Sequence, residues 1–193
     1  MRKVKVEPSF LAMLAVLLVF DENGHGLLLL LAVLFHELGH MAVLLLRGCR
    51  IERVYLIPGG LDIRYEEKHS SYGGDLLIAA AGPGVNLMTA MLFAPVDHPT
   101  ADYFVGVNLV LCFFNLLPVY PLDGGKILYT IMTYFSPMGG GKIFFLFSGT
   151  LALLLFVLSC GACFYNLRAL WSVFVFGAVL LVQKLGYIYK EAI

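Results

Sequence analysis

The sequence predicts an all-α integral membrane protein with about six transmembrane helices and a small β-hairpin or sheet at the cytoplasmic face. Three observations predict this class: 60% of the residues are hydrophobic and only 13% are charged, long apolar stretches recur, and basic residues alternate between the loops that join them. A soluble domain carries about a quarter charged residues. We therefore expect a single membrane-embedded domain over residues 1–193.

Six apolar stretches are the candidate spans. The second, third and fifth are long enough to cross a bilayer unaided. The first, of about 13 residues, and the fourth are short, so they would be tilted or would thin the bilayer. Length alone leaves the number of spans open by one or two. The stretches are 8–20, 27–46, 75–95, 103–117, 143–164 and 169–187.

Lysine and arginine predict the orientation. From the N-terminus, the successive tails and loops hold 3, 0, 5, 0, 2, 1 and 2 of the 13 basic residues. Basic residues mark cytoplasmic loops, so six spans with both termini in the cytoplasm place 12 of them inside and 1 outside. Formal net charge is zero, and nothing indicates a nucleic-acid partner. No small-x-small cleavage site follows the first stretch, so we interpret it as a retained membrane segment.

The first basic loop predicts strands. In residues 51–67, IERVYLIPGGLDIRYEE, apolar residues alternate with others on both sides of a Pro-Gly-Gly break. This pattern is typical of two short strands and a turn. A plain surface hairpin and a sheet edge that receives an extended peptide are the two interpretations.

A polar motif interrupts the second apolar stretch. FHELGH, residues 35–40, places His36, Glu37 and His40 in an otherwise almost wholly apolar segment. Residues four apart lie on one face of a helix, so the two imidazoles can bind one zinc ion. Glu37 suits a general base acting on a zinc-bound water, which is the chemistry of H-E-x-x-H. The alternative is a polar cluster satisfied by neighbouring helices, although ionisable residues at this depth are functional by default.

A candidate third ligand follows the fourth stretch. Two histidines need another protein ligand and an open position for water. Asp123 is the only acid in NLLPVYPLDGG, residues 115–125, where Pro118 and Pro121 break helices. We expect irregular backbone to present Asp123, which is tolerated in a membrane only where protein or a wet cavity surrounds it. The alternatives are an aspartate in an ordinary turn, or an N-cap of a helix that starts near Gly125.

The expected depths of the three ligands agree. At 1.5 Å per residue, His40 lies about 9 Å and His36 about 15 Å from the cytoplasmic end of its helix. The fourth stretch also runs inward, and Asp123 follows it. All three side chains can therefore meet in the cytoplasmic half of the membrane.

Residues 79–86, AAAGPGVN, carry the last candidate. The small residues allow helices to approach closely, and Pro83 leaves a backbone carbonyl without its helical donor. Asn86 is a polar side chain within a span and needs a partner. Helix packing alone is the alternative interpretation of this segment.

These three motifs together resemble the site-2 protease family of intramembrane zinc metalloproteases. HELGH, then AGPGVN at 81–86, then NLLPVYPLDGG occur in the family's order, and the resemblance covers about residues 27–126, the catalytic core, with accessory helices at 8–20 and 143–187. The resemblance implies His36, His40 and Asp123 as ligands of one zinc ion per chain, and Glu37 as the catalytic acid/base. It places Asn86 close to the active site.

Within the family, LIPGG and the six-span outline are most similar to the bacterial stage IV sporulation branch, which cleaves a membrane-tethered pro-sigma factor. The resemblance implies a multi-pass protein of a bacterial cell membrane. Its partners would be the lipid bilayer, a membrane protein substrate cut near the cytoplasmic face, and membrane-bound regulators. Within these 193 residues we expect no PDZ insertion and no nucleotide-sensing domain. Lys126 stands where arginine is common in the family.

Two other functions stay open at this stage. A membrane metal-ion transporter needs polar sites open to both faces, whereas the outward half of the predicted spans is nearly free of ionisable residues. A catalytically inactive metal-binding scaffold would not need Glu37. Cys160 and Cys163 form a C-x-x-C within an apolar span, for which packing and redox or metal use are the two interpretations.

Overall fold

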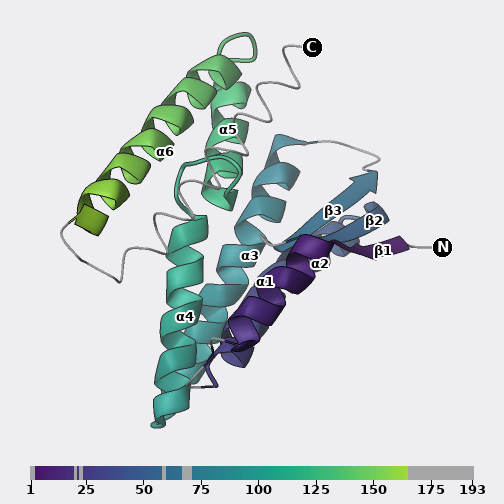
Figure 1. The fold of residues 1–193 in the computed structure, drawn as a ribbon. Coiled ribbons are helices and arrows are strands. Elements are labelled where there is room, and N and C mark those ends of the chain that lie inside the picture. The colour runs from purple at the N-terminus through teal and green to yellow at the C-terminus, as the bar shows by residue number, and fades with distance from the viewer. Residues whose placement is uncertain (1–2, 20, 22–23, 58–59, 67–70, 165–193) are drawn as a thin grey trace. The chain divides into compact units, whose positions relative to one another are not determined.

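A computed structural model describes residues 3–19, 21, 24–57, 60–66 and 71–164, and contacts within the chain divide it into two units, 1–116 and 117–193 (Figure 1). The described part is mostly helical with one small sheet, as predicted. In the first unit the elements are β1 (Lys3–Val6), α1 (Pro8–Val19), α2 (Gly26–Leu46), β2 (Arg50–Ile57), β3 (Gly60–Glu66), α3 (Tyr72–Phe93) and α4 (Pro99–Asn115). In the second they are α5 (Asp123–Phe135) and α6 (Gly140–Phe164).

Helices α2, α3 and α4 pack together (Figure 1). At Gly39 of α2 the two backbones approach so closely that a Cβ atom would lie 2.7 Å from the carbonyl oxygen of Ala81 on α3. Phe104 of α4 packs against Phe35 of α2 and Phe93 of α3, with ring centroids 6.4 and 5.2 Å apart. Small residues at the contact let helices in a membrane pack by their backbones, so the small residues of α3 do pack a helix.

Side chains cap the starts of these helices. Asp21 accepts hydrogen bonds from the backbone N–H groups of His25 and Gly26, both at 2.8 Å, and so satisfies two donors at the start of α2. Ser71 accepts from the N–H of Gly74 at 3.2 Å and caps α3. Pro99 occupies the first turn of α4, where its missing N–H removes no helical bond.

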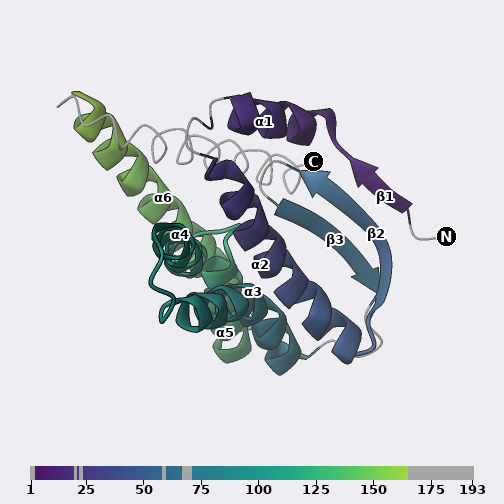
Figure 2. The same ribbon diagram turned by 90° about the horizontal axis from the view of Figure 1, so that it is seen from below.

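The predicted hairpin is confirmed, and a third strand joins it. β2 pairs antiparallel with β3, and β1 pairs parallel with β2, which gives the order β1-β2-β3. Figure 2 shows β3 between β2 and α2, so the outer edge of β3 is the sheet edge that faces α2. β2 is paired on both sides and offers no free edge.

The second unit contains the helix α5, which the sequence analysis raised only as an alternative, with a start near Gly125. α5 begins at Asp123 with Leu122 as its N-cap residue, so Asp123 belongs to a helix and not to irregular backbone. The irregular segment lies just before it, with a cis peptide between Tyr120 and Pro121. A Cβ atom on Gly125 would lie 2.5 Å from the carbonyl of Val119, so the turn folds tightly onto the first turn of α5.

Two described helices, α2 and α3, are long and apolar enough to cross a membrane, and the apolar part of α6 over 140–155 is shorter. α1 and α4 match the two stretches that were predicted to be short, with 12 and 17 residues. The predicted sixth stretch, 169–187, and the Cys160–Cys163 side chains lie outside the described residues. The count of six spans, the cytoplasmic position of the sheet and the single domain stay predictions.

Candidate metal centre

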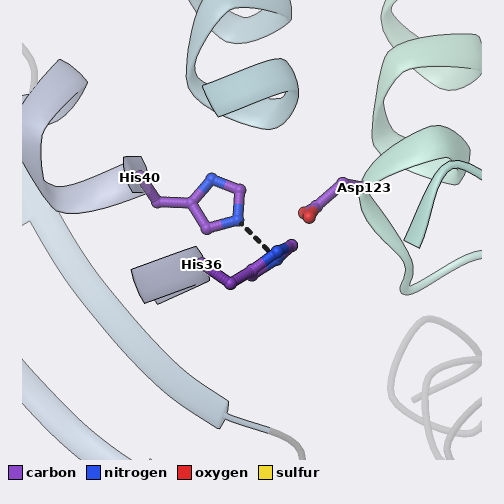
Figure 3. Close-up of side chains that lie close together, drawn as sticks. All are labelled: His36, His40 and Asp123. Carbon is purple, nitrogen blue, oxygen red and sulfur yellow. Dashed lines mark hydrogen bonds between the residues drawn. The ribbon is translucent and has the colours of Figure 1, made fainter. Parts of the chain in front are cut away.

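The two histidines of HELGH lie side by side on α2. Nε2 of His36 and Nε2 of His40 are 3.1 Å apart (Figure 3), and both side chains are buried. Their rings are nearly perpendicular, at 80°, with centroids 4.8 Å apart. The same-face placement follows from the helical repeat, because four residues are slightly more than one turn.

The backbone of α3 fixes which nitrogen of His40 is available to a metal. Nδ1 of His40 lies 2.7 Å from the carbonyl oxygen of Ile78. A carbonyl oxygen only accepts, so Nδ1 carries the proton and donates it, and Nε2 is left as the unprotonated nitrogen. A hydrogen bond from the second ring nitrogen to a carbonyl orients histidine ligands in metal sites.

Gly82 leaves space for the ring nitrogens. A Cβ atom on this residue would lie 2.6 Å from Nε2 of His36 and would also collide with Nε2 of His40. Any other side chain would therefore occupy the position toward which both nitrogens point. Only glycine at position 82 lets α3 close over the histidine pair.

The histidine pair fits a zinc ion. Two Zn–N bonds of about 2.0–2.1 Å at a tetrahedral angle separate the nitrogens by about 3.3–3.4 Å, and the observed separation is 3.1 Å. The contact is also at hydrogen-bond distance, so either a proton or a cation lies between the two ring nitrogens. The fixed tautomer of His40 and the space above Gly82 both suit a metal there.

Glu37 is buried, with 9% of its surface exposed, and lies against the start of β3. A Cβ atom on Gly60 would collide with Oε1 of the Glu37 carboxylate. Gly60 also has a φ of +128°, which side-chain-bearing residues rarely adopt. The carboxylate next to the histidine pair is thus in contact range of the strand edge.

Asp123 is buried at the start of α5, with 3% of its surface exposed. Its carboxylate oxygen Oδ1 accepts a hydrogen bond from Nζ of Lys126 at 2.9 Å. A helix N-terminus and an ammonium group both favour the ionised carboxylate, which is the form that binds metal. Lys126 therefore supports the charge of Asp123 despite standing where arginine is common.

Asn86 lies on the same face of α3 as Gly82, one turn further along. Its side chain is fully buried, and neither Oδ1 nor Nδ2 has a hydrogen-bond partner among the described residues. Leaving a buried amide unsatisfied costs about 1–3 kcal/mol. A hydrogen bond from the Asn86 amide to a water molecule or to a bound peptide would offset that cost.

Sequence reasoning named the candidate ligands and Glu37 but missed the glycines that leave space beside them. Gly82 and Gly60 are not chemical groups, and only the packing of α3 and β3 against α2 shows their role. Pro83 lacks the N–H that would bond the carbonyl of Ala79 in a regular helix. The carbonyl that orients His40 is a different one, that of Ile78. The signal in the sequence was Gly82 and Pro83 standing together in a predicted span.

Comparisons with known proteins find similar sequences and a similar fold. Residues 25–100 match the sequence profile described as Peptidase family M50. Stage IV sporulation protein FB of Bacillus subtilis strain 168 is 37% identical over 139 residues, which cover 68% of this chain and 48% of that protein. A zinc metalloprotease of Methanocaldococcus jannaschii is 34% identical over 117 residues, or 55% of this chain and 34% of that protein.

The fold matches a solved structure titled Site-2 Protease from Methanocaldococcus jannaschii. The TM-score is 0.68 at 24% identity, and the match covers 94% of this chain and 88% of that chain. The chain spans less than half the length of these curated relatives.

Proposed function

From the match of residues 25–100 to the profile of Peptidase family M50, we propose that this chain is an intramembrane zinc metalloprotease of the site-2 protease family. The observation that carries the proposal is the buried histidine pair of α2, with one ring oriented by the Ile78 carbonyl and space left by Gly82. The pair lies in α2, one of the two described helices that are long and apolar enough to cross a membrane.

We assign the zinc ligands to His36, His40 and Asp123, each of which offers one ligand atom. Catalytic zinc sites have three protein ligands and one open position. Nε2 is the metal-binding atom of His40 because Nδ1 is engaged with Ile78. The buried carboxylate of Asp123, which accepts a hydrogen bond from Lys126, is the proposed third ligand.

Glu37 is the residue that moves the proton. Bound zinc supplies Lewis-acid polarisation and makes water nucleophilic near neutral pH. Glu37 takes the proton of the attacking water and delivers it to the leaving amine. Glu37 follows the first proposed ligand in the sequence, and its carboxylate lies against Gly60 at the start of β3.

Asn86 and the edge of β3 are proposed to hold the substrate. A transmembrane substrate must unwind before its peptide carbonyl can be attacked, and unwinding in lipid leaves N–H and C=O groups that each cost several kcal/mol. Addition of the unwound segment to a sheet edge satisfies them. β3 is the edge strand beside α2, and the Asn86 amide is buried one turn from Gly82.

The substrate class follows from the membrane setting. We propose a transmembrane or membrane-tethered protein that is cut near the cytoplasmic face, with the enzyme multi-pass in a bacterial membrane and both termini in the cytoplasm. Similarity to stage IV sporulation protein FB supports a finer proposal, a role in sporulation with a pro-sigma factor as substrate. Membrane-bound regulators would then act on this chain.

Co-expression with candidate single-span proteins tests the function. Each candidate carries a tag on its cytoplasmic side, and cleavage is scored by the appearance of a shortened fragment. We expect cleavage of at least one candidate, and its loss when zinc is chelated from the purified enzyme and substrate. Zinc movement into vesicles without any cleavage would favour the metal-ion transporter instead.

A further inference from the structure

The three-stranded sheet has two chemically different faces. Residues paired across strands share a face, and neighbours along one strand alternate between faces. The register aligns Lys5 with Tyr55, and Arg53 with Arg64. The basic positions of this first face are Lys3, Lys5, Arg50, Arg53 and Arg64, and its acidic positions are Asp62 and Glu66. We call it the basic face.

Three cations gather around one tyrosine on the basic face. Nζ of Lys5 lies 5.9 Å and Cζ of Arg64 lies 5.2 Å from the centroid of the Tyr55 ring. Arg53 donates a hydrogen bond from Nη1 to the Tyr55 hydroxyl at 3.4 Å. That hydrogen bond, with the nearby positive charges, lowers the pKa of Tyr55 below its usual value. Lys5, Arg53 and Arg64 are all exposed.

The opposite face of the sheet is apolar. Its positions are Val4, Val6, Ile51, Val54, Leu56, Leu61, Ile63 and Tyr65. Among these, Val4 is 62% exposed and Val6 is 48% exposed. Moving exposed valine side chains from water into an apolar medium is favourable, because it lowers the free energy of the system.

Short connections hold this sheet close to the ends of the candidate membrane helices. β2 begins four residues after α2 ends at Leu46, and only Glu7 separates β1 from α1. An extended chain advances at most about 3.3–3.6 Å per residue, so the start of β2 lies within about 15 Å of the end of α2. The start of β2 therefore lies near the end of α2, while the hairpin end of the sheet, where Gly60 approaches Glu37, lies further along α2 toward its middle.

We propose that the sheet enters an anionic membrane obliquely from the headgroup layer, with Val4 and Val6 against the acyl chains and Lys5, Arg53 and Arg64 reaching the lipid phosphates. Amphipathic helices with basic polar faces bind membranes in this way. Long basic side chains bury their stems while keeping their charges at phosphate level. The inference shares the membrane setting of the proposed function but does not depend on proteolysis.

A depth measurement on the full chain tests this proposal. The four native cysteines are replaced by alanine, and one cysteine is placed at Val4 or, for comparison, at exposed Glu52. Each carries an environment-sensitive fluorophore. The protein is reconstituted into nanodiscs of phosphatidylcholine, alone or mixed with phosphatidylglycerol, that contain lipids brominated along the acyl chain. We expect stronger quenching at position 4 than at position 52, and more quenching at position 4 when phosphatidylglycerol is present.

Charge variants separate lipid recognition from simple proximity. The triple change Lys5→Gln, Arg53→Gln and Arg64→Gln should remove the dependence of quenching on phosphatidylglycerol. Each lost cation should lower the equilibrium constant for docking of the sheet on the anionic membrane by about fivefold. The charge-conserving set Lys5→Arg, Arg53→Lys and Arg64→Lys should keep it. Lys142→Gln, an exposed lysine outside the sheet, is the matched control and should change nothing.

Three outcomes would overturn the proposal. One is equal quenching at positions 4 and 52, another is quenching at position 4 that ignores phosphatidylglycerol, and the third is a glutamine variant that behaves like the parent. If polyglutamate peptide bound the basic face while lipid composition had no effect, the surface would belong to an acidic protein partner. An inactive Glu37→Gln chain should show the full lipid dependence, so the failure of the protease assignment and the failure of this one are distinguishable.

Discussion

Gly82 of α3 faces His36 of α2 so closely that a single added carbon would lie 2.6 Å from the Nε2 nitrogen. The metal site thus depends on what α3 lacks as well as on what α2 supplies. His40 shows the same dependence, because the Ile78 carbonyl of α3 fixes its tautomer. α3 therefore forms part of the candidate metal site, in addition to packing against α2.

Replacing Gly82 by alanine should weaken zinc binding while the protein still folds. The added methyl group displaces the ring nitrogens, and changes to groups that orient metal ligands reduce affinity by about 10–100-fold. Zinc retained after dialysis against a graded chelator measures the effect. Gly84→Ala is the control, because a Cβ atom there would meet nothing within 4 Å. Equal zinc retention in the two variants would contradict the proposed role of Gly82.

Gly60→Ala should reduce cleavage and leave zinc content unchanged. A methyl group at position 60 pushes against the Glu37 carboxylate but touches no zinc ligand. A displacement of about 1 Å at a catalytic group can cost about 10²-fold in rate. Gly48→Ala controls for backbone strain, since Gly48 also has a positive φ, +71°, with open space around it. If both variants lost activity equally, backbone strain and not Glu37 would be the cause.

Proline scanning separates the edge strand from the central strand. Proline in 54–57 of β2 removes donors that pair within the sheet, so it should lower expression as well as cleavage. In 61–65 of β3, every second position should have its N–H directed away from β2. Proline at those positions should reduce cleavage while expression and zinc content stay near normal. If proline left cleavage unchanged at every position of β3, the hairpin would be a plain surface hairpin and not a binding edge for the substrate.

The sequence predicted the parts of this fold that depend on local pattern. His36, Glu37 and His40 share a helix because their spacing is helical, and the hairpin follows from alternation around a Pro-Gly-Gly break. β1 was missed because four residues carry little pattern, and its parallel partner lies about 50 positions away. α5 was raised only as an alternative to irregular backbone, because two prolines and two glycines obscure its start, although Pro121 lies outside the helix.

The membrane topology remains to be measured. Cysteine-accessibility labelling should place positions 24 and 98 on the outer side, and positions 5, 68 and 190 on the cytoplasmic side, because basic residues mark cytoplasmic segments. Labelling of whole cells with an impermeant maleimide, before and after lysis, checks each position. Finding position 190 outside would break the six-span prediction and change the side on which the substrate is cut.

The most direct test of the central claim measures zinc content and cleavage together in Glu37→Gln, with the three ligand variants His36→Ala, His40→Ala and Asp123→Ala beside it. Glu37→Gln keeps the ligands but removes the base, so it should retain about one zinc per chain while cleavage of a co-expressed substrate falls by at least about 10²-fold. The ligand variants should lose both. Normal cleavage by Glu37→Gln, or full zinc content in Asp123→Ala, would contradict the assignment of a zinc protease that uses these residues.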